Sequence, residues 1–240
     1  MGADERESEM NVEVFADDES AARAAAKFIA GEASAAAAAR GQFVMAVSGG
    51  HTPWIMLRAL ANEELPWDRL HVVQVDERIA PPGHPDRNLT HLRESLLDHS
   101  PLSPEQIHAM PVESPDPETA ARQYAQTLGE LAGSPPTLDL VHLGLGPDGH
   151  TASLVPGDPV LNTTDKDVAL TGIHQGRRRM TLTYPIINRA RRILWLVTGR
   201  EKLDMLIRLR DGDVSIPAGT IHRDRVVIFA DRAAVGEVAA

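Results

Sequence analysis

The sequence has 240 residues, of which 42% are hydrophobic and 24% charged, a composition that is ordinary for a globular protein with a sizeable core. Its formal net charge of −10 disfavours general binding to nucleic acid or to anionic membranes, because both need a basic face. The chain has 0 Cys, which excludes disulfides, thiolate zinc sites and cysteine nucleophiles.

The first residues carry no targeting signal. Residues 1–8 are acidic and polar, whereas a signal peptide needs a basic start followed by an apolar run. No apolar stretch approaches the roughly 18 residues that a membrane-spanning helix requires. We therefore expect a cytoplasmic protein that is not bound to membranes, with residues 1–10 frayed.

Strand and helix signals alternate along the chain. Apolar runs bounded by glycine or proline indicate strands, and apolar spacing of three and four residues indicates helices. The alanine-rich segment favours a long helix that Gly41 ends. The predicted elements, in chain order, are a strand at 11–15, a helix at 19–40, a strand at 43–47, a helix through Trp54–Leu60, a strand at 70–75, a helix through Leu89–Leu97, an irregular connector at 101–117, a helix at 118–131, a strand at 138–145, strands at 180–184 and 193–198, a helix opening at 199–202 and a strand at 226–230.

This order of elements predicts the fold class. Repeated strand–loop–helix units favour an α/β fold, in which helices cover both faces of a largely parallel sheet as a three-layer sandwich. No linker is long enough to require a boundary, so we expect a single domain over residues 1–240.

Ser48-Gly49-Gly50 follows a predicted strand and precedes a predicted helix, with Pro53 suited to the first helical position. Glycines let the backbone approach a ligand closely, and the free N–H groups of a helix start favour a phosphate. A plain tight turn explains the same residues. The segment lacks the Lys-Ser/Thr of a Walker loop and is not Gly-x-Gly-x-x-Gly.

Two cationic residues in other loops are candidates for anion binding. Arg78 ends the segment Asp76-Glu77-Arg78 and could hold a phosphate with two hydrogen bonds, or form an exposed ion pair instead. Lys202 lies at a helix start, where the helix dipole disfavours a cation unless an anion also binds. A solvated lysine is the simpler alternative. Within the run of three arginines, Arg179 adjoins a predicted strand.

Gly144-x-Gly146-x-Asp148-Gly149-His150 is the segment that most strongly indicates chemistry. Glycines shape the turn and bring a carboxylate within two residues of an imidazole. Histidine acts as a general base near neutral pH, and a carboxylate can orient it and stabilise its charged form. The alternative is an Asx turn with an exposed histidine.

In combination these segments resemble the glucosamine-6-phosphate isomerase/6-phosphogluconolactonase family, and within it the lactonases. The resemblance spans about residues 12–236 in the expected order, and the most specific piece is Asp148-Gly-His150-Thr-Ala-Ser153. The other matching pieces are Ser48-Gly49-Gly50-His51-Thr52-Pro53, Asp76-Glu77-Arg78 with Asn88, Arg179-Met-Thr-Leu-Thr183, Asn188-Arg-Ala190, Gly199-Arg-Glu-Lys202 and Asp231-Arg-Ala-Ala.

The resemblance implies a glucosamine-6-phosphate deaminase-like fold and hydrolysis of 6-phospho-D-glucono-1,5-lactone, the second step of the oxidative pentose phosphate pathway. It implies His150 as the general base and Asp148 as the residue that orients it. No metal, organic cofactor or nucleic-acid partner is implied, and a monomer is favoured. Residues implied to hold the sugar phosphate or shape its pocket are Ser48, Gly49, Gly50, Arg78, Lys202, Arg179, Asp76 and Asn88.

The sequence also departs from the family pattern, and two other functions remain open. Val155 stands where phenylalanine is usual, and Arg87-Asn88-Leu89 replaces the usual Ser-Asn-Tyr, which affects the lining of the pocket more than its chemistry. A sugar-phosphate isomerase/deaminase would carry Gly-His-Ile-Ala-Phe-Asn-Glu where this chain has Gly149-His-Thr-Ala-Ser-Leu-Val. A non-catalytic sugar-phosphate sensor would usually add a DNA-binding helix-turn-helix, for which the short N-terminal segment leaves no room.

Overall fold

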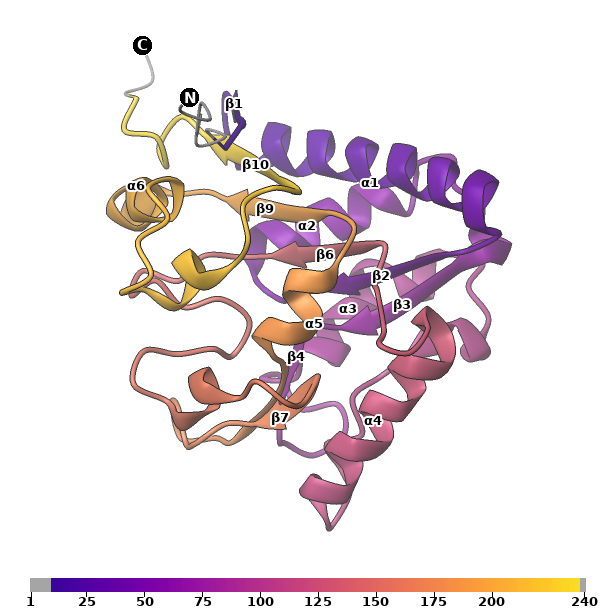
Figure 1. Ribbon diagram of the computed structural model, residues 1–240. Helices are drawn as coiled ribbons and strands as arrows, with labels where there is room; N and C mark the ends of the chain where they lie inside the picture. Colours follow the sequence, from indigo (N-terminus) through magenta and orange to yellow (C-terminus); the bar gives the residue numbers. More distant parts are fainter. Residues whose placement is uncertain (1–9, 238–240) are drawn as a thin grey trace, which may run out of the picture.

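The computed structural model describes residues 10–237 (Figure 1). Its strands and helices alternate as an α/β chain does. The elements are β1 (Val12–Phe15), α1 (Asp18–Arg40), β2 (Phe43–Val47), α2 (His51–Leu60), β3 (Leu70–Gln74), β4 (Asp76–Arg78), α3 (Asn88–Ser95), β5 (Ile107–His108), α4 (Pro117–Ala132), β6 (Leu140–Leu143), β7 (Val168–Leu170), β8 (Arg179–Leu182), α5 (Tyr184–Arg189), β9 (Ile193–Val197), α6 (Leu203–Arg210) and β10 (Val226–Asp231).

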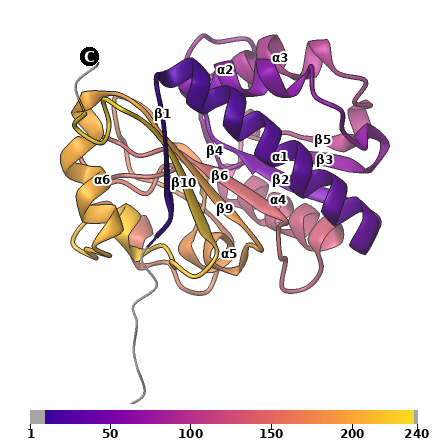
Figure 2. The same cartoon turned by 90° about the horizontal axis from the view of Figure 1, so that it is seen from above.

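The central sheet has seven strands in the order β1-β10-β9-β6-β2-β3-β5, and every neighbouring pair is parallel. Helix α1 starts beside β1 at one edge and crosses the sheet to reach β2 (Figure 2). Its first turn is capped by Asp17, which accepts a hydrogen bond from the Ser20 N–H at 2.7 Å. Its end is closed by Gly41, whose φ of 80° is left-handed.

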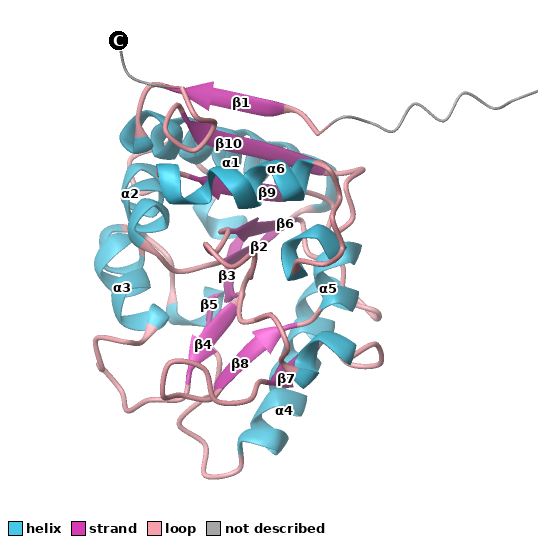
Figure 3. Ribbon diagram, turned by 90° about the vertical axis from the view of Figure 1, so that its left-hand side faces the viewer, coloured by secondary structure: helices cyan, strands magenta, loops and turns pink. Residues whose placement is uncertain are grey.

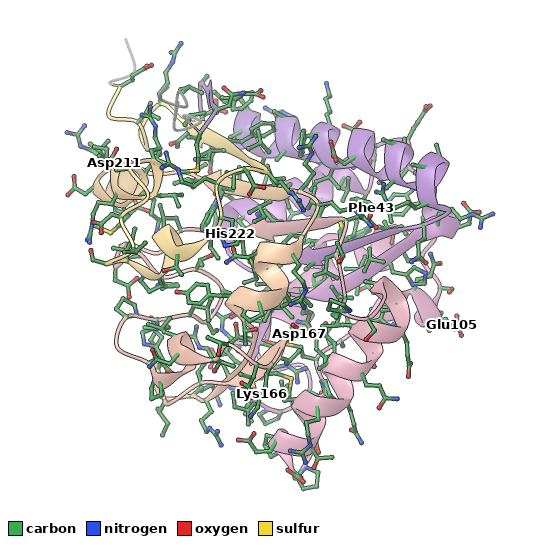
Figure 4. The ribbon with its side chains drawn as sticks, viewed as in Figure 1. Phe43, Glu105, Lys166, Asp167, Asp211 and His222 are labelled. Atoms are coloured by element: carbon green, nitrogen blue, oxygen red, sulfur yellow. The ribbon has the colours of Figure 1, made fainter. Side chains whose placement is uncertain are left out.

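Alternate residues of the central strands face two separate apolar cores. Phe43 and Met45 pack toward α1, α2 and α3, whereas Val44 and Ala46 pack toward the layer that contains α4, α5 and α6. Figure 3 shows α2 and α3 on one side of the sheet and α4 and α5 on the other, and Figure 4 marks Phe43 on the α1 side. The predicted three-layer sandwich is therefore confirmed.

A second, smaller sheet joins the layer on the α4 side. Strands β4, β8 and β7 pair in antiparallel fashion, and β4 places Arg78 opposite Arg179 of β8. The Leu182 N–H donates to the Val75 carbonyl at 2.8 Å, and Val75 itself donates to β2. The small sheet is thus bonded to the end of the central one.

The structure corrects several local expectations. Residues 76–78 form a strand rather than a loop, and residues 107–108 of the predicted irregular connector pair with β3. Strand β7 and helix α5 were not predicted, because the first is three residues long and the second follows β8 directly. Helix α2 begins at His51, so Pro53 is its third residue.

Expectations about the ends and the domain organisation have different outcomes. Residues 1–9 of the segment expected to be frayed lie outside the described residues, but Met10 is buried against the larger core, which corrects that expectation for this residue. The single domain over residues 1–240 stays a prediction. Within residues 10–237, none of the helices combines the length and apolar character needed to cross a bilayer.

The order of the strands creates a switch point beside β2 and β6. These two strands are neighbours, but the chain continues from β2 to β3 on one side and from β6 to β9 on the other. The loops that follow them therefore diverge and leave a crevice at the carboxyl ends of the strands, where open α/β sheets bind ligands.

Candidate active site

A pocket of about 490 Å³ occupies this crevice. The loops after β2, β6 and β9 line it together with β4, the start of α3 and the start of β8. All the site residues predicted from the sequence line the pocket except Asp148, which contacts it through His150. The predicted residues in the lining are Ser48, Gly49, Gly50, Asp76, Arg78, Asn88, His150, Arg179 and Lys202.

His150 and Asp148 form a hydrogen-bonded pair in the loop after β6. The Nδ1 atom of His150 lies 2.5 Å from Oδ1 of Asp148, which also accepts the His150 backbone N–H at 3.2 Å. Partial burial raises the pKa of Asp148, but the hydrogen bonds and the charge of His150 together outweigh burial and hold this pKa below its usual range. With Nδ1 bonded to a carboxylate, Nε2 is the ring nitrogen left to accept a proton.

Glycine is required at position 146 for this pair to form. A Cβ atom on Gly146 would lie 2.1 Å from Nδ1 of His150 and 2.7 Å from Oδ1 of Asp148. The Gly146 N–H also donates to the His150 carbonyl at 2.8 Å, which closes the loop on itself. The glycines seen in the sequence therefore make room for the contact between the imidazole and the carboxylate.

The loop Ser48–Gly50 is held from behind by β6. Ser48 is buried, and its hydroxyl donates to the His142 carbonyl at 2.9 Å while its N–H donates to Nδ1 of His142 at 3.3 Å. A Cβ on Gly49 would lie 2.1 Å from Oδ1 of Asn88, and Gly50 has a φ of 133°. Both glycines are thus needed for the close approach of this loop to α3 and for its turn into α2.

Three of the predicted polar residues form one hydrogen-bonded network. Asn88 donates through Nδ2 to the carbonyl of Asp76 at 3.0 Å and to its carboxylate at 3.1 Å, and Oδ1 of Asn88 accepts from Arg78. The second carboxylate oxygen of Asp76 accepts the Ser153 hydroxyl at 2.5 Å. This network ties β4 and α3 to the segment that follows the His150 loop.

Glu77, to which the sequence analysis gave no role, stabilises this network through hydrogen bonds to the backbone of its members. Its side chain is fully buried and accepts the backbone N–H groups of Arg78, Asn88 and Leu89, each at 2.8 Å. It also forms a buried ion pair with Arg87 at 3.1 Å. Glu77 therefore caps the first turn of α3 from the neighbouring strand. The only sequence signal was an acidic residue whose neighbours on both sides already had proposed roles.

Arg179 brings a second guanidinium next to that of Arg78. It is 5% exposed, its Nη2 donates to Oε1 of Gln175 at 2.9 Å, and its Nε atom has no hydrogen-bond partner among the described residues. Burial is the main cause, and repulsion from Arg78 the second, that lowers the pKa of Arg179 from its usual value. An arginine nevertheless remains charged near neutral pH. Two adjacent, incompletely paired guanidiniums favour an anion in the pocket.

Lys202 adds a third cation from the loop after β9. It is the last residue of a short 3-10 turn before α6, and its Nζ lies 3.9 Å from a carboxylate oxygen of Glu201. Gly199 opens this turn with a φ of 95°, and its N–H donates to the buried carboxylate of Asp231 at 3.1 Å. The turn is thus fixed by β10, and the lysine side chain is left to reach the pocket.

Metal ligands are not grouped in the part of the chain that the structure describes. No three of its histidine, aspartate and glutamate side chains are arranged so that they could hold a metal ion. Residues 10–237 therefore offer no cluster of side chains suited to a metal centre.

Comparison with known proteins identifies the family. The family described as "Glucosamine-6-phosphate isomerases/6-phosphogluconolactonase" matches residues 16–229. A 6-phosphogluconolactonase of Synechocystis sp. is 43% identical over 171 residues, which cover 70% of this chain and 71% of that protein. A 6-phosphogluconolactonase of Mycobacterium tuberculosis is 35% identical over 242 residues, which cover 95% of this chain and 98% of that protein.

A solved structure shows that the fold extends to the deaminases. A monomeric glucosamine-6-phosphate deaminase of the NagB superfamily superposes with a TM-score of 0.82, over 94% of this chain and 98% of that one, at 20% identity. A likeness at this identity concerns the fold alone, and it confirms the deaminase-like fold class. The family match and the two relatives lead to one conclusion: this chain belongs to the glucosamine-6-phosphate isomerase/6-phosphogluconolactonase family.

Proposed function

We propose that this protein hydrolyses 6-phospho-D-glucono-1,5-lactone to 6-phospho-D-gluconate, the second step of the oxidative pentose phosphate pathway. The observation that carries the proposal is that the His150–Asp148 pair shares one pocket with Arg78, Arg179 and Lys202. A general base and an anion-binding group are the two things that water attack on a phosphorylated lactone requires. Full-length relatives that carry the lactonase name support the same reaction.

In the proposed mechanism, His150 activates water. Its Nε2 atom takes a proton from a water molecule as the water oxygen bonds to the C1 carbonyl carbon of the lactone. The bond between C1 and the ring oxygen then breaks, and the ring oxygen receives the proton from His150. Asp148 holds the ring through Nδ1 and stabilises the imidazolium that forms between the two steps. A general base contributes about 10²–10⁴-fold to such a reaction.

The cationic side chains serve binding and orientation. The phosphate lies far from the reacting carbonyl, so its contacts place the lactone ring against His150 without taking part in bond making. We assign these contacts to Arg78, Arg179, Lys202 and the backbone amides of Gly49 and Gly50. Asp76 and Asn88 shape the pocket beside Arg78 and are positioned for the sugar hydroxyls.

Two alternative functions fit the pocket less well. An isomerase/deaminase would carry a glutamate seven residues into the Gly149-His motif, where this chain has the buried, apolar Val155. A non-catalytic sensor has no need of the His150–Asp148 pair, which is intact. As part of the proposal, we take the protein to be a monomeric, single-domain cytoplasmic enzyme, with no metal, organic cofactor or nucleic-acid partner.

The decisive experiment follows the δ-lactone directly. The substrate is generated in situ from glucose 6-phosphate and its dehydrogenase, and its disappearance is measured with and without the protein. We expect faster hydrolysis of the phosphorylated lactone than the spontaneous rate, and far less acceleration for gluconolactone, which lacks the phosphate. Disappearance at the spontaneous rate with folded protein would overturn the proposal and direct attention to isomerase assays and binding screens.

A further inference from the structure

His142 is a polar residue in an apolar position of the fold. It belongs to β6, whose four residues are all buried. It lies two residues after Leu140 and therefore on the same face of the strand, and Leu140 packs toward α1 and α2. It does not line the pocket, and its own side chain is fully buried. Its Nε2 atom has no hydrogen-bond partner among the described residues.

Such a residue costs stability. A buried N–H without a partner loses its hydrogen bond to water and gains none in the protein, so an apolar side chain of similar size would be more stable at this position. Burial also lowers the pKa of His142 to about 3, so the ring is neutral near neutral pH. A neutral imidazole offers one acceptor nitrogen, and here the acceptor faces the Ser48 N–H at 3.3 Å.

Both hydrogen-bond donors of Ser48 are directed to His142. The hydroxyl donates to the His142 carbonyl and the N–H donates to the ring, so neither is free for a ligand in the pocket. Ser48 is 5% exposed, whereas Gly50 is exposed at the start of α2. The anion-binding amides of this loop are therefore those that follow Ser48.

From these contacts we infer that His142 is a positioning residue, which holds the Ser48–Gly50 loop in its anion-binding shape, and that Ser48 anchors this loop instead of donating to the substrate phosphate. The inference rests on the proposed function, because it assigns the loop to the phosphate of a phosphorylated lactone. It explains why a histidine stands where an aliphatic residue would pack at lower cost.

Two amide variants separate positioning from packing. In His142→Asn the side-chain oxygen can occupy the place of Nδ1 and still accept from Ser48. In His142→Gln the same amide group reaches the place of Nε2, and the Ser48 N–H loses its partner. Both variants bury a neutral amide, so a comparison of their melting temperatures corrects for the cost of burial.

The expected result is a difference in KM. H142Q should raise KM for the phosphorylated lactone about five- to tenfold, with kcat within about twofold, and should weaken calorimetric binding of 6-phosphogluconate by the same factor. H142N should stay within about threefold of wild type. Equal KM values in H142N and H142Q, whether raised or unchanged, would overturn the inference.

Ser48→Ala provides a second test, which also decides the matter if H142Q does not fold. If Ser48 only anchors the loop, loss of its hydroxyl should raise KM about two- to threefold. If Ser48 contacts the phosphate directly, the substitution should raise KM tenfold or more, which would overturn the inference. In the double variant the two effects should be less than additive, because both residues act through one loop. If the wild-type protein does not turn over the lactone, the proposed function is refuted but the inference about His142 is not. Binding of 6-phosphogluconate to wild type and to the variants then still tests the role of His142.

Discussion

In the loop after β6, His150 and Asp148 stand two residues apart and contact each other directly, with side chains that are 26% and 44% exposed. In the segment from β4 to α3, Arg78 and Asn88 are held by Glu77, which is fully buried and has partners on both elements. The first arrangement is local and reaches solvent, whereas the second depends on residues that are distant in sequence and buried.

This difference teaches where mutations should act. Changes to the local pair should alter the chemical step and leave folding almost intact, because few other residues depend on it. Changes to the buried support should reduce stability and disturb binding together, because one carboxylate holds both a strand and a helix start. Substitutions in the two regions test this division between chemistry and support.

The largest effect is expected for His150→Ala. Removal of the general base should lower kcat for the phosphorylated lactone by about 10²–10⁴-fold. Binding of 6-phosphogluconate should remain within about threefold of wild type, since the cations that bind the phosphate are unchanged, and the melting temperature should change little. Wild-type turnover in this variant would show that another group is the base.

Glu77→Ala tests the buried support. Breaking a buried ion pair costs about 3–5 kcal/mol, because Arg87 loses its buried partner and the backbone N–H groups of α3 lose their acceptor. Urea unfolding should show this loss, and KM for the phosphorylated lactone should rise as Arg78 and Asn88 shift.

A matched control exists for this variant. Glu113 pairs with the same Arg87 at 2.9 Å, but its side chain is 51% exposed. In Glu113→Ala the buried Arg87 keeps Glu77 as its partner, so this variant should cost only about 1 kcal/mol. Similar losses in the two variants would remove the distinction between local chemistry and buried support.

The same division explains what the sequence could predict. The His150–Asp148 pair is a short-range feature, so its residues and their spacing were visible in the chain, and the long elements α1, β2 and α4 were clear from composition and apolar periodicity. The parallel sheet also implied that the loops after its strands would meet at one edge, and the described pocket lies there.

Features that depend on distant partners were not predictable. Strand β4 has three polar residues and exists because β8 pairs with it across about a hundred residues of chain, so no local pattern marks it. The roles of Glu77 and His142 likewise follow from partners in α3 and in the Ser48 loop. Their sequence signals, an acidic residue between two candidate site residues and a histidine within an apolar strand, show only that each position is unusual.

Three histidines, of which His142 is buried and His71 and His108 are half-buried, give stability a dependence on pH. Burial lowers the pKa values of His71, His108 and His142, the last to about 3. Below the unfolded pKa of about 6.5, the unfolded chain binds protons that the folded protein does not, so stability is full above that pH and falls as pH decreases. His142 alone should contribute about 2 kcal/mol between pH 6.5 and 4.5.

Urea unfolding at pH 7.0, 5.5 and 4.5 measures this slope, and His142→Asn is the control because asparagine does not titrate. The slope should be smaller in H142N than in wild type. The lowered pKa of Asp148 acts in the same direction, but only below about pH 4, so it does not affect this window. Identical slopes for wild type and H142N would show that His142 takes up no protons on unfolding.

The smallest effect, and the most specific to the local pair, is expected for Gly146→Ala. The added methyl would lie 2.1 Å from Nδ1 of His150, so the ring must move away from Asp148. We expect kcat to fall about tenfold, which is the loss of one oriented hydrogen bond of about 1.4 kcal/mol, with the melting temperature nearly unchanged. Gly144→Ala meets no atom within 4 Å and should keep kcat much closer to wild type. Because both variants add the same methyl group to the same loop, the ratio of their kcat values reports the contact between His150 and Asp148 alone. A ratio near one would mean that the imidazole works without its carboxylate, and Asp148 would then have no part in the mechanism.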